Sequence, residues 1–315
     1  MFRQKIERGE SGALLYGITP PRRDYTEERI REISARRIER IRGLDVDGLV
    51  VYDLQDESLR NPETRPFPYL PTVDAATYSN NYLSTLEMPT VLYKPVATET
   101  PESFAKWAAS RNNPSTVCVF VGAPSREFPA TLKLSEAYKI RREAAPEMLL
   151  GGVIIPERHA VSRHEHLRLM EKTAAGCSFF VSQCVYNPQA TRDFLSDYHY
   201  HCRDHGQTPR YLIFTLTVCG SVETLKFMKW LGISIPHWLE NDLSHASDIL
   251  ETSLHSCRDI AKGIIEYCSQ KNLPFGFNIE SVSIRKAEIE AATVLTHQIA
   301  GLLGRSRGAA KQSGQ

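Results

Sequence analysis

Short, almost continuously apolar stretches recur along the chain, separated by longer segments in which apolar positions repeat every three or four residues. Eight such stretches can be recognised: GALLYGI (12–18), DGLVVYD (47–53), MPTVLYK (88–94), TVCVFVG (116–122), LLGGVII (149–155), CSFFVSQ (177–183), YLIFTLT (211–217) and PFGFNIE (274–280). A short continuous apolar run is typical of a strand that is buried on both faces of a parallel sheet.

The segments between these stretches have the periodicity of amphipathic helices, which we place at 27–42, 101–111, 134–144, 164–174, 190–204, 222–231, 254–270 and 287–303. Thr100 followed by Pro101 and an acidic residue is a typical helix start. Eight strand-helix repeats predict an α/β fold, a single-domain (β/α)8 TIM barrel. A doubly wound open sheet is the structural alternative, but the first stretch is not followed by the glycine-rich G-x-G-x-x-G pattern.

Two segments interrupt this rhythm within a barrel domain that we assign to residues 1–303. The connection 53–72 is long and carries four prolines, so we expect an ordered loop over the mouth of the barrel. The tail 304–315 is small, polar and basic, and its composition predicts disorder.

Composition excludes several classes of protein. The 315 residues include 38 Lys and Arg against 37 Asp and Glu, which argues against nucleic acid or an anionic membrane as a partner. Since no apolar run approaches ~20 residues and the first residues lack a signal-peptide core, we expect a cytoplasmic protein. The seven scattered cysteines predict reduced thiols in the core. A homo-oligomer stays open.

In a TIM barrel the functional residues lie at the carboxyl ends of the strands. A polar side chain that ends an apolar strand is costly unless it is satisfied or used. The polar and glycine positions at these ends are Tyr52, Lys94, Gly122, Glu157, His159, Gln183, Thr217, Asn278 and Glu280. Lys94 could alternatively form a Schiff base with a carbonyl substrate, as barrel aldolases do.

Histidines gather near position 200. His201 and His205 are four residues apart, with His199 and Cys202 beside them, which is a spacing that metal ligands use. They fall near the end of a predicted helix, where the helix dipole favours histidine. We therefore expect a solvent-facing cluster and no metal site.

Four motifs together resemble the methylenetetrahydrofolate reductase family. They are YGITPPR (16–22) at the first strand, PERH (156–159) after the fifth, the block from Lys172 to Asn187 around the sixth, and LGISIPHWLENDL (231–243) after the seventh. Their order and spacing follow that family over most of residues 13–300. The resemblance implies reduction of 5,10-methylenetetrahydrofolate to 5-methyltetrahydrofolate with NAD(P)H and FAD.

The resemblance also implies roles for individual residues. Gln183 would contact the folate, and we group Tyr52, Thr217 and Asn278 with it as substrate-binding residues. His159, Lys172 and Glu165, the last in place of the family's usual aspartate, would lie along the flavin. We assign Lys94 and Gly122 to the cofactor as well.

Two mechanistic positions depart from the family pattern. The first-strand glutamate, the family's proton donor, is replaced by Gly17, and the fourth-strand aspartate near the flavin is replaced by Ala123. The second change makes direct hydride transfer from NAD(P)H an alternative to FAD. Because the eighth strand of a closed barrel pairs with the first, we expect Glu280 to supply the missing acid, with Glu157 as a second catalytic carboxylate.

Three functions stay open at this point. The first is the folate reductase. The second is another folate-dependent or lyase-type barrel enzyme that uses Lys94. The third is a non-catalytic homologue that binds folate.

Overall fold

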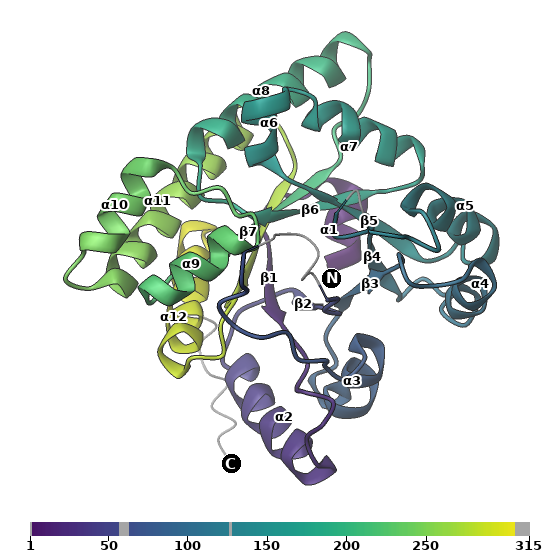
Figure 1. Ribbon diagram of the computed structural model, residues 1–315. Coiled ribbons are helices and arrows are strands. Elements are labelled where there is room, and N and C mark those ends of the chain that lie inside the picture. The colour runs from purple at the N-terminus through teal and green to yellow at the C-terminus, as the bar shows by residue number, and fades with distance from the viewer. Residues whose placement is uncertain (1, 57–62, 126–127, 306–315) are drawn as a thin grey trace, which may run out of the picture.

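A computed structural model describes residues 2–56, 63–125 and 128–305, and Figure 1 shows a closed barrel of parallel strands surrounded by helices. Each strand pairs with the next, and β8 pairs with β1. The strands are β1 (Ala13–Ile18), β2 (Gly48–Val51), β3 (Thr90–Pro95), β4 (Val117–Val121), β5 (Leu149–Ile154), β6 (Phe179–Cys184), β7 (Tyr211–Thr217) and β8 (Phe275–Glu280). This confirms the predicted (β/α)8 fold, and every strand overlaps its predicted apolar run.

The helices with a clear apolar period also form where the sequence predicts them. They are α2 (Glu27–Arg42), α4 (Pro101–Ala109), α5 (Leu134–Ala144), α7 (Glu165–Ala174), α8 (Pro188–Asp204), α9 (Val222–Trp230), α11 (Ile249–Gln270) and α12 (Lys286–Leu302). At the start of α4 the Thr100 hydroxyl accepts from the Ser103 backbone N–H, and the Ser103 hydroxyl accepts from that of Thr100. This reciprocal cap satisfies two N–H groups that the helix itself cannot bond.

Shorter helices were not predicted. They are α1 (Phe2–Arg8), α3 (Ala75–Tyr82), the 3-10 turn η2 (Ser84–Leu86), α6 (Pro156–Ser162) and α10 (His237–His245). Of these, α6 occupies the connection between β5 and α7. Pro156 is the first residue of α6, where its fixed φ suits a helix, and Arg163 ends the helix with a φ of 51°.

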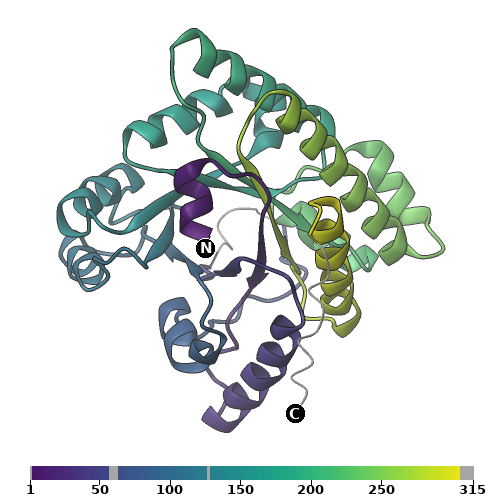
Figure 2. The same cartoon turned by 180° about the vertical axis from the view of Figure 1, so that it is seen from behind.

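The amino end of the barrel is sealed. Apolar side chains fill the interior, and α1 lies across this end in the view of Figure 2. Phe2 is fully buried, with its ring edge-on to Phe179 at 6.0 Å between centroids. Access to the barrel axis is therefore from the carboxyl ends of the strands. A second apolar layer lies between the strands and the helices and contains buried cysteines, and all seven cysteines are free and buried.

The described part of the predicted 53–72 loop reaches α9 (Figure 1). Trp230 of α9 donates from its indole to the carbonyl of Glu63 at 2.8 Å, and Phe67 lies edge-on to Phe227 at 5.1 Å. Arg65 stands over the Phe227 ring. These contacts join the connection after β2 to the helix after β7; residues 57–62 of the predicted loop lie outside the described residues.

The predicted tail falls almost wholly outside the described residues, which end at Arg305. The Arg305 guanidinium forms an ion pair with Asp47 and also donates to the carbonyl of Gly12 at 2.6 Å. Among the described residues, no helix combines the length and the apolar character that a membrane span requires.

Candidate functional site

The centre of the open end is formed by β8 and its neighbours on both sides. Asn278 donates from Nδ2 to the Tyr52 hydroxyl at 2.8 Å and lies 3.3 Å from Thr215 Oγ1 and 3.4 Å from Glu280 Oε2. Cys184 donates from its thiol to Glu280 Oε1 at 3.2 Å. Side chains from β6, β7 and β8 therefore meet that of Tyr52, the residue directly after β2.

The glycine at position 17 leaves the space that this cluster fills. A Cβ built at Gly17 would lie 2.9 Å from the Glu280 Cβ, 3.0 Å from a ring carbon of Tyr52 and 3.2 Å from Asn278 Oδ1. Real Cβ atoms essentially never approach a neighbour to 2.9 Å, and the other two contacts are tighter than most. Glu280 thus occupies the region next to the missing first-strand side chain, because Tyr16 of β1 is paired with Ile279 of β8.

Burial raises the pKa of Glu280 above its usual value, and hydrogen bonds from Tyr52, Cys184 and Asn278 oppose this shift in part. Among the described residues that form the cluster, none is a cation that would hold the carboxylate charged. Removing a carboxyl group from water favours its neutral form. Glu280 is only partly buried by surface area, so a ligand at the mouth can reach this carboxyl group.

Two tyrosines form one wall of this centre. The rings of Tyr52 and Tyr93 are 4.7 Å apart and tilted by 60°. Burial also raises the pKa of both phenols, with the charge of Glu280 as the second cause. Neutral aromatic rings beside hydrogen-bonding groups suit a flat heterocycle.

Sequence reasoning missed Tyr93 and Cys184. The alternation of a strand could have revealed Tyr93, because neighbouring residues point to opposite faces and the apolar interior contains Val91 of the same strand. Cys184 gave no such signal, because the pairing of β6 with β7 shifts register between Val181 and Cys184.

Two of the predicted substrate-binding residues line the β6 and β7 side. Gln183 is partly buried and donates from Nε2 to the carbonyl of Leu231 at 3.3 Å. Thr217 is fully buried. In the described part of the chain, Thr217 Oγ1 and Asn278 Oδ1 are buried without a hydrogen-bond partner. Such atoms cost free energy unless a ligand or water satisfies them.

Glu157 supports the wall next to β6 and does not meet Glu280. Its Oε1 accepts from the backbone N–H groups of Tyr186 at 3.0 Å and Asn187 at 3.4 Å. Burial raises its pKa to about 7, although these two hydrogen bonds lower it. The two carboxylates predicted to be catalytic therefore lie in different surroundings. Glu157 is hydrogen-bonded to the backbone that directly follows β6.

The three side chains that the resemblance assigns to a flavin are turned toward protein partners. Glu165 is fully buried and accepts two hydrogen bonds from the Arg158 guanidinium and one from the Ile155 N–H, at 2.8 to 2.9 Å. Lys172 donates to the carbonyl of Val153. His159 is fully buried, and its Nε2 lies 2.9 Å from Asp197 Oδ2.

This arrangement does not fit a flavin. A flavin phosphate or ribose would need Glu165, Lys172 and His159 to leave these partners, and buried groups that lose their partners are destabilised. Ala123 also offers no carboxylate at the fourth strand.

Lys94 and Gly122 lie away from the cluster around Glu280. Lys94 is buried, forms an ion pair with Glu99 and stands over the Trp107 ring of α4 at 5.4 Å. Its side chain therefore faces the helical layer, opposite to that of Tyr93, which does not favour a Schiff base at the mouth. The carbonyl of Gly122 accepts from Gln55 Nε2 at 3.2 Å, so this glycine connects the loops after β2 and β4.

The histidines near position 200 are not simply exposed. The His201 ring is partly buried, 5.6 Å from the His166 ring of α7, and stacks on His205 at 4.2 Å. His166 in turn approaches His159, at 5.4 Å between centroids. The expectation that the cluster only faces solvent is therefore wrong, because α7 covers His201.

Comparisons with known proteins relate the chain to solved structures. No protein-family model matches the chain, and no curated protein matches it. An uncharacterized protein from Clostridium thermocellum, which binds two copies of 5-methyl-5,6,7,8-tetrahydrofolic acid, is 47% identical with a TM-score of 0.85, over 96% of this chain and all of that one.

A second solved structure, a GH10 endoxylanase retrieved from a sugarcane soil metagenome, has 9% identity and a TM-score of 0.52, over 95% of this chain and 99% of that chain. At this identity the likeness reflects the barrel fold alone. The first match is of another kind, since almost half of the residues are shared over the whole barrel. The chain therefore belongs to the same family as the uncharacterized Clostridium thermocellum protein.

Proposed function

We propose that this protein binds a reduced folate at the carboxyl end of its barrel and reduces 5,10-methylenetetrahydrofolate to 5-methyltetrahydrofolate. The observation that carries the proposal is Glu280, a carboxyl group with a raised pKa among hydrogen-bonding side chains at the mouth. The 47% identical relative binds 5-methyltetrahydrofolate, which is the product of this reaction.

The chemistry follows from what the cluster can do. Protonated Glu280 gives its proton to N10 of the folate while the bond between N10 and the methylene carbon breaks, which leaves an iminium at N5. A hydride from NAD(P)H, bound as a second substrate, then adds to the methylene carbon and yields the methyl group and NAD(P)+. Solvent reprotonates Glu280. General acids act best when their pKa is near the working pH.

Neighbouring groups would position the pterin for this step. The Tyr52 and Tyr93 rings offer a face for stacking, and the unpartnered atoms Asn278 Oδ1 and Thr217 Oγ1 can accept from ring N–H and amino groups. Gln183, on β6, would add a further polar side chain to these acceptors. A heterocycle with several donors on one edge would satisfy atoms that are otherwise unpaired.

A second candidate is a protein that binds the folate without reducing it. The observation that favours it is the pairing of Glu165, Lys172 and His159 with protein partners, which takes up the groups that a flavin would use. In this case the mouth would hold 5-methyltetrahydrofolate for storage or for another protein.

One pair of measurements tests both candidates. Purified protein is titrated with 5-methyltetrahydrofolate by calorimetry, and NADH and NADPH oxidation is followed with 5,10-methylenetetrahydrofolate, with and without added FAD. We expect saturable binding, and oxidation that matches the 5-methyltetrahydrofolate formed and does not need FAD. Binding without oxidation would support the second candidate, and absence of binding would overturn both.

A further inference from the structure

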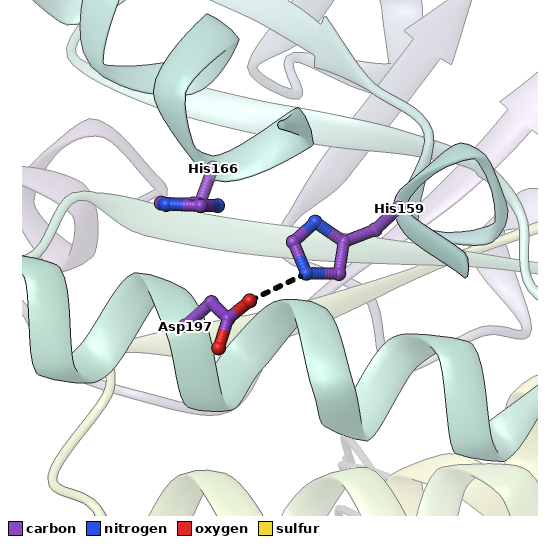
Figure 3. Close-up of side chains that lie close together, drawn as sticks. All are labelled: His159, His166 and Asp197. Carbon is purple, nitrogen blue, oxygen red and sulfur yellow. Dashed lines mark hydrogen bonds and ion pairs between the residues drawn. The ribbon is translucent and has the colours of Figure 1, made fainter. Parts of the chain in front are cut away.

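Three helices on one side of the barrel bring together two histidines and an aspartate. His159 lies on α6, His166 on α7 and Asp197 on α8, and one potential ligand atom of each lies within 4.8 Å of those of the other two. Figure 3 shows the two imidazole rings on either side of the Asp197 carboxylate, with the bond from His159 Nε2 drawn. Residues far apart in sequence therefore converge on one small volume.

Hydrogen bonding within the protein does not satisfy this group. His159 is fully buried, and its single described hydrogen bond is the one between Nε2 and Asp197. The Nδ1 atoms of His159 and His166 are both buried and, among the described residues, have no hydrogen-bond partner. The hydrogen bond between His159 and Asp197 satisfies one ring nitrogen, His159 Nε2, and leaves the Nδ1 atoms of His159 and His166 without a partner. Buried polar atoms without partners usually indicate a missing ligand or water.

The chemistry of the group selects a class of ligand. Three adjacent imidazoles, those of His159, His166 and His201, would repel one another as cations, whereas neutral imidazoles are good ligands for a transition metal. Two histidines and a carboxylate form a typical three-ligand set for Zn²⁺, which prefers four ligands in a tetrahedron.

His201 is a candidate for the fourth ligand. His201 follows Asp197 by one turn of α8, so both side chains lie on the same face of that helix, and its ring centroid is 5.6 Å from that of His166. A rotamer change of His201, or a water molecule, would complete the tetrahedron. We propose that His159, His166 and Asp197 form a Zn²⁺ site that joins α6, α7 and α8.

The metal would stabilise the packing of helices beside the barrel mouth and would not contact the reacting atoms. α6 also carries Glu157, which holds the backbone of Tyr186 and Asn187 after β6. Tying α6 to α8 through the metal would hold this wall of the barrel mouth in place. The site is therefore structural, and the inference does not depend on which reaction the mouth performs.

The test measures metal binding directly. Chelator-treated and dialysed protein is titrated with Zn²⁺ by calorimetry against a competing chelator, and Co²⁺ is added separately to record its absorption spectrum. We expect one Zn²⁺ per chain, an intense tetrahedral-type Co²⁺ spectrum, and a rise in Tm with Zn²⁺.

Two variants locate the site. His166→Gln, at a partly exposed position, and Asp197→Asn should each lower Zn²⁺ affinity by at least about 100-fold, because losing a ligand costs more than losing its hydrogen-bond partner, and should reduce the rise in Tm accordingly. The matched control is His255→Gln, which removes an exposed histidine that pairs with Glu251 on α11 and should bind Zn²⁺ like the unmodified protein. Circular dichroism of each variant without metal checks the fold.

Two results would overturn the inference. One is an unmodified protein that shows no saturable Zn²⁺ binding near one per chain. The other is a His166→Gln variant that folds and binds Zn²⁺ with unchanged affinity, since the ion would then bind elsewhere.

Discussion

Two buried carboxyl groups at the carboxyl end of the barrel, Glu165 and Glu280, have opposite surroundings. On the β5 side, Glu165 is fully buried but receives both arms of the Arg158 guanidinium and a backbone N–H. On the β8 side, Glu280 receives a thiol, a phenol and an amide, without a cation in the cluster, and burial raises its pKa. The first carboxylate is stabilised in its charged form by its partners, whereas burial shifts the second toward its neutral form.

This difference separates residues that stabilise the structure around the site from residues that take part in its chemistry. A buried carboxylate with an arginine partner stabilises the helices around it, and its loss leaves a charge uncompensated. A buried carboxyl group without a cation destabilises the fold, so its presence at the mouth points to function. The polar residues of the β5 side and of the β8 side should therefore respond differently to substitution.

The largest effect is expected for Glu280→Gln. The amide keeps the shape of the side chain but has no proton to give, so turnover of 5,10-methylenetetrahydrofolate should fall by about 10²- to 10⁴-fold, while affinity for 5-methyltetrahydrofolate stays nearly unchanged. Steady-state NAD(P)H oxidation and calorimetry measure the two quantities. Glu223→Gln at the start of α9, whose carboxylate is exposed, is the control and should retain full turnover. Equal turnover in Glu280→Gln and the unmodified protein would remove Glu280 from the mechanism.

The second effect is one of stability. Glu165→Ala removes the partner of the Arg158 guanidinium and of the Ile155 N–H, and the free energy of unfolding should fall by about 3 kcal/mol. Urea denaturation measures it. Because the mouth does not use Glu165 in this proposal, folate affinity of the folded variant should not change. Arg168→Ala, at 3.7 Å from Glu165, should cost much less. A clear loss of folate affinity in folded Glu165→Ala would contradict the division between the two sides.

The fold could be predicted from the sequence because each strand is a continuous apolar run and each long helix has its own apolar period. Short elements gave weaker signals: α1 is recognisable only by what Phe2 packs against inside the barrel, and α6 is a single proline-initiated segment. Lys94 ends a strand like Glu280 does, yet it points to the helices. Only strand alternation, and not the position in the chain, separates the two.

The position of the site could be predicted from the sequence, but the partners of its side chains could not. That Glu280 lies beside Gly17 follows from closure of the barrel. The pairing of Glu165 with Arg158, and the convergence of His159, His166 and Asp197, depend on how α6, α7 and α8 pack side by side. No local spacing encodes that packing, because the ligands come from three different helices.

A smaller effect is expected for Gly17→Ala. The added Cβ would lie 2.9 Å from the Glu280 Cβ, so Glu280 and Tyr52 must shift. Overpacking of this kind costs about 1 to 3 kcal/mol, and turnover should fall about tenfold as the acid moves from its place. The control is Gly263→Ala, a helical glycine with open space around it, which should be neutral or stabilising by up to about 1 kcal/mol. A Gly17→Ala variant with normal turnover would mean that the position of Glu280 is not critical.

The smallest effect concerns Asp53, which directly follows Tyr52 in the chain and is influenced by the charges of Asp74 and Lys94. Burial raises the pKa of Asp53 to about 6, and the neighbouring charge of Asp74 adds to this shift, while Lys94 opposes it. The unfolded chain has an Asp pKa of about 3.9, so the native state binds the proton more tightly. Its contribution to stability is then fully present below about pH 4 and is lost as the pH rises through about 6.

Asp53→Asn should therefore be more stable than the unmodified protein at about pH 8, by about 1 kcal/mol because solvent screens this partly exposed group. The difference should shrink as the pH falls through about 6 and disappear below about pH 3, where the aspartate is protonated in both the folded and the unfolded state. Urea denaturation across this range measures it, with Asp259→Asn on the exposed face of α11 as the control. A stabilisation that does not vary with pH would show that charge burial is not its cause, and a less stable variant at pH 8 would group Asp53 with Glu165 as a carboxylate that the fold stabilises in its charged form.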